Sequence, residues 1–342
     1  MNDPKHIIIY RISAIGDVAM LVQSVHNVLQ NNPDLKITMI TRPKLEVLFG
    51  EHERLFFHAI DTKNSHKNLP GLIKFAKEIK SMKPDLFIDM HDVLRSKIIR
   101  SSLKINGIKV MVFDKGRSEK EQMLKGLKTF EQVNHSIERY NDVLSRTGFT
   151  LDPAFRYVLP VHDNEFPSSK KLKRIGFAPF AAHESKEWGL ENTKAFLHAI
   201  EQQTELEVLL FGGGKEEERK LKELTFEYKC VQSVAGQYSL EEELSIMKSC
   251  DLFIAMDSSN MHMADLVGCK VISIWIATHP YFGFYAWSNK ENSIVLSQQD
   301  YPAIPLSIFG KLKSEKDLQK VNDIRRLISP EIVIKEIAEI LV

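Results

Sequence analysis

The sequence predicts an α/β protein with two domains in series, each built on a parallel sheet wrapped by helices. Strand-like apolar runs alternate with amphipathic helical segments along most of the chain. The chain has 342 residues, which is too long for most single cores. The alternation breaks once, at 150–173, where three prolines and no sustained periodicity are typical of an interdomain linker. We therefore expect an N-terminal domain over 1–160 and a C-terminal domain over 174–342.

The first domain is expected to open with a buried strand at 7–10, because that run is strongly apolar. A helix follows, with apolar residues at helical spacing from Val18 to Leu29. The charged stretch 114–133 has no periodicity, and we expect a mobile loop there. Further strands are expected at 36–41, 55–60, 85–90 and 108–113, and further helices at 70–82, 92–103 and 134–147.

The second domain restarts the alternation after the linker. A closing amphipathic helix from Pro330 belongs to this domain unless it packs back across the first one. The chain therefore repeats an architecture and not a short sequence unit. The strands of this domain are expected at 174–180, 206–211, 251–256 and 270–275, and its other helices at 190–203, 215–227, 239–249 and from about 260 onward.

Composition narrows the classes of function. The 46 Lys and Arg residues balance 45 Asp and Glu residues, so no overall field attracts nucleic acid. Cys230, Cys250 and Cys269 form no C-x-x-C pair, which favours a reduced setting over a disulfide scaffold. The N-terminal apolar run is too short for a signal peptide, and no stretch approaches the roughly 18 apolar residues of a membrane span. We expect a soluble, cytoplasmic protein.

Four loops that follow predicted strands are the candidate ligand-binding segments, because ligands of parallel sheets bind outside the carboxyl ends of the strands. They are Ser13–Asp17, 177–188, 211–219 and 256–264. Several standard motifs are missing from them. No G-x-G-x-x-G follows the first strand, Glu216 stands where a P-loop needs Ser or Thr, and neither G-x-S-x-G nor H-E-x-x-H occurs. Dinucleotide-dependent hydride transfer, P-loop phosphoryl transfer and serine hydrolysis are therefore disfavoured.

Three of these loops carry a family resemblance. The segments "YRISAIGDVAM", "SKEWGLEN" and "MDSSNMHMADLVG" resemble, in order, the recurring motifs of the ADP-heptose:lipopolysaccharide heptosyltransferases, family nine of the glycosyltransferases. "PDLFIDMHDVLRS" and "HSIERYNDVLSRTGF" resemble the family as well. The resemblance implies the GT-B fold, in which two Rossmann-like domains face each other across a cleft. It also implies that the N-terminal domain takes the acceptor, that the C-terminal domain takes the nucleotide sugar, and that the anomeric centre inverts without a required metal or other cofactor.

The acceptor side of such a reaction needs a base, because a bare alcohol is a poor nucleophile. Asp17 fits this role, and the resemblance places the family's proposed catalytic aspartate there. The alternative is an ordinary carboxylate at a helix N-terminus, stabilised by the helix dipole. The other acceptor-side candidates are Arg11, Ser13, Gly16, Asp92 and Arg95.

The donor side must stabilise the charge of a leaving diphosphate, which without a metal falls to basic side chains and to N–H groups at a helix N-terminus. Lys186 fits the first requirement. The second is met by Asp257, Ser258, Ser259 and Asn260, which lead into a predicted helix, and by His262 in its first turn. A plain cap followed by a packed histidine is the alternative. Gly212 and Gly213 indicate either close approach of backbone to ligand or a plain strand-to-helix turn.

The favoured function is therefore an inverting, metal-independent transfer of heptose from ADP-heptose to a glycolipid acceptor of the lipopolysaccharide core or lipid A type. Peripheral contact with the inner face of the cytoplasmic membrane is left open. Two alternatives remain: a transferase of this fold that uses another nucleotide sugar, and a catalytically weak nucleotide-sugar binding protein. The second arises because family members usually have Gly where this chain has Ser259, and often Pro where it has Asn260.

Overall fold

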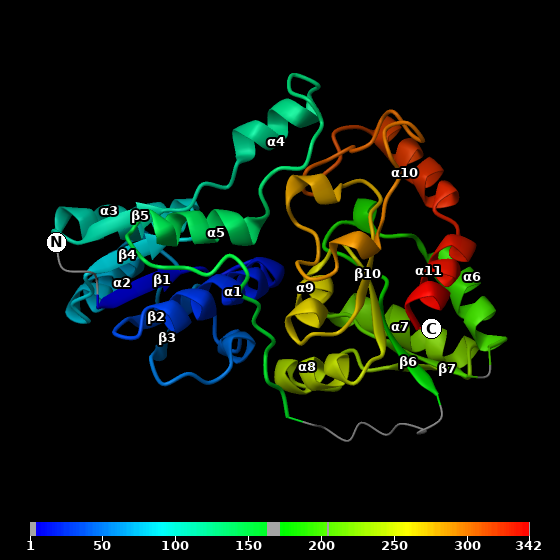
Figure 1. Cartoon of the computed structure of the whole chain (residues 1–342), viewed down its shortest axis with the longest axis horizontal. Coiled ribbons are helices and arrows are strands. Elements are labelled where there is room, and N and C mark those ends of the chain that lie inside the picture. Colours follow the sequence, from blue (N-terminus) through cyan, green and yellow to red (C-terminus); the bar gives the residue numbers. More distant parts are fainter. Residues whose placement is uncertain (1–4, 163–171, 204, 342) are drawn as a thin grey trace. The chain divides into compact units, whose positions relative to one another are not determined.

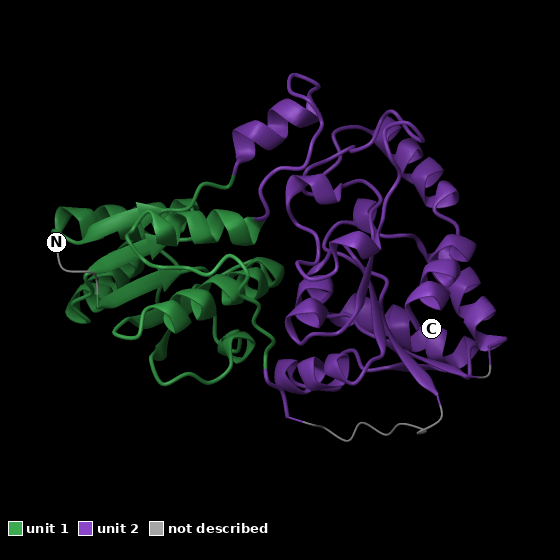
Figure 2. Ribbon diagram, viewed as in Figure 1, with its two compact units in different colours: residues 1–115, 136–159 green, residues 116–135, 160–342 purple. Residues whose placement is uncertain are grey.

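The computed structural model describes residues 5–162, 172–203 and 205–341. The chain divides into two compact units, shown in different colours in Figure 2. Unit 1 contains residues 1–115 and 136–159, and unit 2 contains residues 116–135 and 160–342. Each unit holds one parallel sheet with helices, so the predicted α/β class is confirmed.

Unit 1 is built on a five-stranded parallel sheet in the order β3-β2-β1-β4-β5 (Figure 1). Its central strand carries Ile7–Ile9, which are fully buried because helices cover both faces of a parallel sheet. The strands are β1 His6–Tyr10, β2 Lys36–Thr41, β3 Leu55–Ala59, β4 Leu86–Asp89 and β5 Lys109–Val112, and the helices are α1 Ile15–Asn31, α2 Leu69–Ser81, α3 Leu94–Ile105 and α5 Ser136–Ser145.

Unit 2 is built on a six-stranded parallel sheet in the order β11-β10-β9-β6-β7-β8. One apolar core runs from its strands to the last helix of the chain. The strands are β6 Lys173–Ala178, β7 Leu206–Leu210, β8 Val231–Ser233, β9 Leu252–Met256, β10 Val271–Ile274 and β11 Ser293–Ile294, and the helices are α4 Arg117–Leu124, α6 Leu190–Glu201, α7 Lys215–Glu227, α8 Leu240–Lys248, α9 Ser259–Leu266, α10 Glu315–Leu327 and α11 Pro330–Leu341.

In both sheets the order in which the chain adds its strands reverses at one point, and the candidate site residues lie at this point. In unit 1 the chain adds strands on one side of β1 and then continues on the other side with β4. In unit 2 the same reversal separates β6 from β9. Loops that leave two neighbouring strands in opposite directions open a crevice at the carboxyl edge, where ligands of such sheets bind.

The segment predicted as a mobile loop at 114–133 is different in the structure. It contains the helix α4 and groups with unit 2, although the N-terminal domain was predicted to run unbroken over 1–160. Met123 and Val133 pack with Phe282 in a small apolar cluster. The Nζ atom of Lys120 lies 3.9 Å from the centre of the Phe284 ring, and its side chain is buried. The loop prediction was wrong because only Lys120 and Met123 of α4 are buried, and two buried residues are too few to show a helical period in the sequence.

The predicted linker at 150–173 is only partly a linker. Its first residues are fixed to α1: Asn27 exchanges hydrogen bonds with the backbone of Asp152, and Gln23 does so with Tyr157. The Tyr157 ring also stacks on His26 with centroids 3.6 Å apart. The remainder of the predicted linker, at 163–171, lies outside the described residues.

The last helix, α11, packs within unit 2. Val333 and Ile337 are buried in the core of this unit, and the helix lies against α6. The helix that precedes it, α10, was not predicted, because only Val321 and Ile324 along its length are buried. Its C-terminal end proves important for the candidate site.

Gly283 fixes the packing of the segment 116–135. Its φ is +76°, and a Cβ atom there would lie 2.5 Å from the carbonyl oxygen of Asn134. We expect Gly283→Ala to lower the free energy of unfolding by about 1–3 kcal/mol through backbone strain and this clash. Gly213→Ala is the matched control, since nothing lies within 4 Å of the added methyl group. Chemical denaturation of both variants tests the prediction; equal stabilities would contradict it.

Candidate active site

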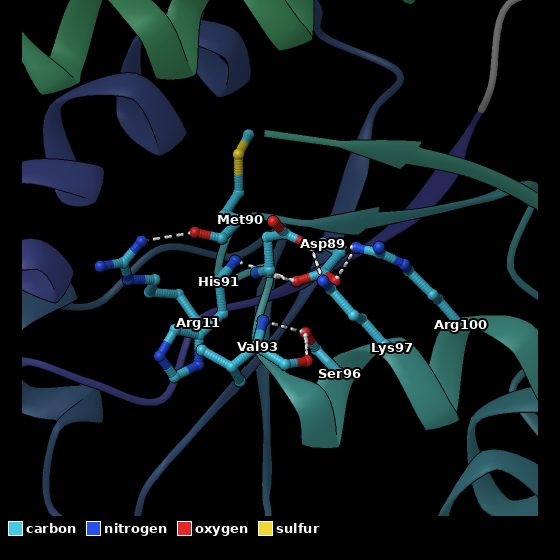
Figure 3. Close-up of polar contacts among 9 residues, drawn as sticks. Arg11, Asp89, Met90, His91, Val93, Ser96, Lys97 and Arg100 are labelled. Carbon is cyan, nitrogen blue, oxygen red and sulfur yellow. Dashed lines mark hydrogen bonds and ion pairs between the residues drawn. The ribbon is translucent and has the colours of Figure 1, made fainter. Parts of the chain in front are cut away.

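Arg11 joins the two loops at the strand reversal of unit 1. It follows β1, and its Nη1 donates to the carbonyl of Met90, which follows β4, at 2.5 Å (Figure 3). Its Nη2 lies 2.5 Å from Oδ2 of Asp17. Burial lowers the pKa of Arg11, but the charge and hydrogen bond of Asp17, together with Tyr140 and Asp89, outweigh this effect, and the pKa is raised overall. A buried cation thus stands beside the candidate base.

Asp17 is both a cap and a partly open carboxylate. It is the third residue of α1, and its Oδ2 accepts a hydrogen bond of 3.1 Å from the backbone N–H of Ala14. The Asp17 side chain is 30% exposed, whereas that of Arg11 is 4% exposed. The capping and catalytic interpretations are therefore compatible, because the contacts that cap the helix also fix the direction of the carboxylate.

Ser13 and Gly16 flank this carboxylate, and His91 joins them from the other loop. The Ser13 hydroxyl lies 3.2 Å from Nε2 of His91. Gly16 is buried in the first turn of α1. Burial, with help from the nearby Arg11 and Lys115 charges, lowers the pKa of His91 to about 3. The imidazole is therefore neutral near pH 7 and acts as a hydrogen-bonding partner for Ser13.

Asp92 and Arg95 differ in whether their charges are already paired within the protein. Arg100 of α3 binds Asp89 at 2.7 Å (Figure 3) and Asp92 at 2.8 Å, so the helix that follows the loop compensates the charge of Asp92. Asp92 also has a φ of +43°, which suits a tight turn after β4. Arg95 is half-buried and makes no hydrogen bond or ion pair with the part of the chain that the structure describes. Arg95 thus has a positive charge that can bind an anionic ligand, whereas the charge of Asp92 is already paired.

Lys186 and Asp257 meet at the strand reversal of unit 2. Lys186 ends the short 3₁₀ helix Glu184–Lys186 after β6, and Asp257 follows β9. Their Nζ and Oδ2 atoms are 2.7 Å apart, and the side chains are 15% and 8% exposed. The same Oδ2 accepts a hydrogen bond of 2.8 Å from Thr278. The Lys186 ammonium group also donates to the carbonyl of Asp257 at 3.4 Å, so the pairing orients Lys186 and leaves one of its three N–H donors for a ligand.

The N-terminus of α9 lies beside this pair. Ser258 is its N-cap residue, yet its side chain makes no capping hydrogen bond. The Ser258 hydroxyl is buried and lacks a hydrogen-bond partner among the described residues. Ser259 and Asn260, which begin the helix, are half-buried. A helix N-terminus with an unsatisfied hydroxyl and an adjacent lysine is well suited to an oxyanion.

His262, Gly212 and Gly213 make contacts within the protein that explain them without a ligand. His262 is buried in α9, close enough to His135 to lower the pKa of that imidazole beyond the effect of burial. The Gly213 N–H donates to Oε2 of Glu217 at 2.9 Å. A Cβ atom at Gly212 would lie 2.8 Å from the Leu221 side chain of α7. These contacts favour packing and a strand-to-helix turn as the reason for the glycines.

Comparison with known proteins decides the family. The model of glycosyltransferase family 9 (heptosyltransferase) matches residues 72–308, well over half of the chain. The chain belongs to this family. It is a glycosyltransferase of the heptosyltransferase type, and its two parallel-sheet units confirm the predicted GT-B class.

Relatives of this family 9 chain are distant in sequence. The lipopolysaccharide core heptosyltransferase OpsX of Haemophilus influenzae is 20% identical over 318 residues, which are 91% of this chain and 89% of OpsX. The structure of Escherichia coli ADP-heptose lipopolysaccharide heptosyltransferase II is similar, with a TM-score of 0.70 and 16% identity over 98% of both chains. The iron-containing dodecameric glycosyltransferase TibC of Escherichia coli has a TM-score of 0.60 and 12% identity over 99% of this chain and 77% of its own.

Sequence reasoning missed three residues that shape the site of this family 9 protein. They are His91, which contacts Ser13, Thr278, which contacts Asp257, and Gly310, which packs on Lys186. His91 and Thr278 follow β4 and β10 by two and four residues, so their position at carboxyl ends of strands was an available signal. Gly310 lies far along the chain from any strand, and the sequence gives no comparable signal for it.

The described residues lack two further features. They contain no group of three or more His, Cys, Asp and Glu residues placed to hold a metal ion. No helix within 5–162, 172–203 or 205–341 is both long and apolar enough to cross a membrane.

The low pKa of His91 predicts acid sensitivity of the fold. The folded protein does not protonate this imidazole until about pH 3, whereas an unfolded chain does so near its ordinary value of 6.5. Stability from His91 is thus complete above about pH 6.5 and is lost as the pH falls. The free energy of unfolding of both proteins is measured at about pH 7.5 and about pH 5.5. Between these values the wild type should lose about 1.4 kcal/mol more than His91→Gln, which has no imidazole to protonate. Chemical denaturation at both pH values measures this difference; identical losses would contradict the pKa assignment.

Proposed function

We propose that this chain is an inverting heptosyltransferase that moves heptose from ADP-heptose to an acceptor of the lipopolysaccharide core or lipid A type. Family membership supports heptosyl transfer, and the names of the relatives in Haemophilus influenzae and Escherichia coli support the core acceptor and the ADP-heptose donor. The observation that carries the proposal is the pairing of Lys186 with Asp257 beside the open N-terminus of α9.

In this proposal the donor diphosphate binds in unit 2. The reaction breaks the bond between the anomeric carbon and the diphosphate, so negative charge builds up on the leaving oxygens. The compensating donors are the remaining N–H of Lys186, the Ser258 hydroxyl and the backbone N–H groups that begin α9. Asp257 holds Lys186 in position and is itself compensated by Thr278. This donor set needs no metal ion, and the proposal includes none.

The acceptor hydroxyl binds in unit 1, beside Asp17. As the hydroxyl oxygen attacks the anomeric carbon, its proton passes to the Asp17 carboxylate. Arg11 and the Ala14 N–H both bind Oδ2, which holds the carboxylate in one direction. Arg95 contributes positive charge for an anionic acceptor. We also propose a cytoplasmic location, in which a lipid-linked acceptor would bring the protein into peripheral contact with the inner face of the membrane.

A second candidate is transfer from a different nucleotide sugar. It is favoured by Ser259 and Asn260, the first two residues of α9, because their side chains narrow the approach of a phosphate to the helix N-terminus. If the same side chains also moved the leaving diphosphate away from the N–H groups of α9, the chain would be a nucleotide-sugar binding protein with weak catalytic activity. The retained contacts of Asp17 and Lys186 argue against that reading.

Donor binding tests the assignment of unit 2. Lys186→Ala should weaken the binding of ADP-heptose by roughly 1.5–3 kcal/mol, because a charge-assisted contact is lost. Lys194→Ala is the matched control, since Lys194 makes an ion pair of 2.8 Å with Glu227 on the surface of unit 2. Titration calorimetry with ADP-heptose and a panel of UDP- and GDP-sugars measures both effects. Unchanged affinity in Lys186→Ala would contradict the proposed donor site. Tighter binding of another nucleotide sugar would contradict ADP-heptose as the donor.

The turnover of Asp17→Asn tests the proposed base. The amide keeps the shape of the side chain and its capping oxygen but cannot take the proton, so turnover should fall by about 10²–10⁴-fold. Asp317→Asn is the control, because Asp317 is the third residue of α10 and caps it through the N–H of Ser314 at 3.2 Å. Steady-state assays, with melting temperature recorded in parallel, separate the two roles. If Asp17→Asn loses stability and keeps its turnover, Asp17 is only a cap.

A further inference from the structure

The C-terminal end of α10 binds the turn that carries Lys186. Arg325 donates from Nη2 to the carbonyl of Glu184 at 2.7 Å and from Nε to the carbonyl of Glu187 at 2.9 Å. These two residues stand on either side of Lys186, two residues before it and one after it. The third guanidinium nitrogen, Nη1, donates to Asn322 at 3.1 Å within α10. One side chain therefore closes the turn from both ends.

Two further hydrogen bonds extend the same attachment. The Trp188 indole N–H donates to the carbonyl of Ile328 at 2.6 Å, and the Asn192 amide donates to the carbonyl of Arg325 at 2.7 Å. Trp188 is fully buried. The segment from Glu184 to Asn192 is thus hydrogen-bonded to two residues at the C-terminal end of α10, Arg325 and the C-cap residue Ile328.

On its other side, the Lys186 side chain lies against Gly310. This glycine has a φ of +91°, and a Cβ atom there would lie 2.8 Å from Cε of Lys186 and 2.9 Å from its Cγ. The Ser185 hydroxyl donates to the Gly310 carbonyl. Three contacts therefore fix Lys186: Arg325 binds the carbonyls of the turn on either side of it, Gly310 packs on its methylene chain, and Asp257 pairs with its ammonium group.

We propose that Arg325 is a positioning residue for the donor diphosphate and acts through Lys186, an inference that rests on the function proposed above. The planar guanidinium presents its donors in a fixed fork, which allows one side chain to span two carbonyl oxygens. A lysine at this position would donate from a single nitrogen on a flexible chain, without the fixed geometry of the fork. Without the fork, the turn relaxes and the Lys186 ammonium group spends less time in the direction that meets the phosphate oxygens.

A purely structural role makes a different prediction. If Arg325 only joined α10 to the turn, its loss would lower the melting temperature and leave the affinity of the folded protein for ADP unchanged. If Arg325 acts through Lys186, its loss matters only while Lys186 is present. A double-mutant cycle between the two residues therefore separates the roles.

The experiment measures ADP and ADP-heptose affinity by titration calorimetry on the full-length chain. We expect Arg325→Ala to weaken both by about tenfold, Arg325→Lys to weaken them less, and added guanidinium ion to restore part of the Arg325→Ala loss. In a Lys186→Ala background, Arg325→Ala should cause no further loss. Arg326→Ala is the neighbouring control, because its side chain is 75% exposed and contacts Asp323 in the same helix.

The outcomes distinguish this inference from the function on which it rests. Unchanged ADP affinity in Lys186→Ala would overturn both. A weakened Lys186→Ala with an unchanged Arg325→Ala, or losses that add in the double variant, would overturn the role of Arg325 alone. If Arg325→Ala fails to fold, Arg325→Lys carries the same cycle, and an affinity equal to the wild type there would also overturn the inference.

Discussion

Parallel pairing of the strands is the constraint on which the rest of the site depends. All strands of a parallel sheet end at one edge, and the reversal of strand order separates two neighbouring loops there. In unit 1 the reversal lies between β1 and β4, and Arg11 bridges the two loops; in unit 2 it lies between β6 and β9, and the Lys186–Asp257 pair does the same. The same topology thus produces a polar crevice twice, with different chemistry in each.

In each crevice a cation and a carboxylate stand in contact, and their burial differs in a way that suits the proposed roles. In unit 1 the cation is buried and the carboxylate is the more exposed partner, which suits a carboxylate that meets a hydroxyl group. In unit 2 the carboxylate is the more buried partner and the lysine is the more exposed one, which suits a cation that meets phosphate. Removing one partner would leave the other unpaired at a partly buried site, so both residues of each pair are needed for the geometry.

The sequence predicted the local features and missed the long-range ones. The strand β2, which is buried on both faces, and the helix α7, which has one apolar face, were predicted at their observed bounds because the hydrophobic pattern is a local property. The positions of Asp257 and Ser258 at the start of a helix were also local. The attachment of Arg325 to Glu187 spans 138 residues, and no period or motif encodes it. The compensation of Asp92 by Arg100 likewise depends on a turn whose shape the sequence does not reveal.

The most direct test of heptosyl transfer with inversion is the anomeric configuration of the product. The purified chain is incubated with ADP-heptose and a lipopolysaccharide core acceptor in the presence of a metal chelator, and the new glycosidic linkage is analysed by NMR spectroscopy. Direct attack by a hydroxyl that gives its proton to Asp17 predicts a linkage of opposite configuration to the donor, formed at the same rate with and without the chelator. A retained configuration, or turnover that the chelator abolishes, would contradict the mechanism.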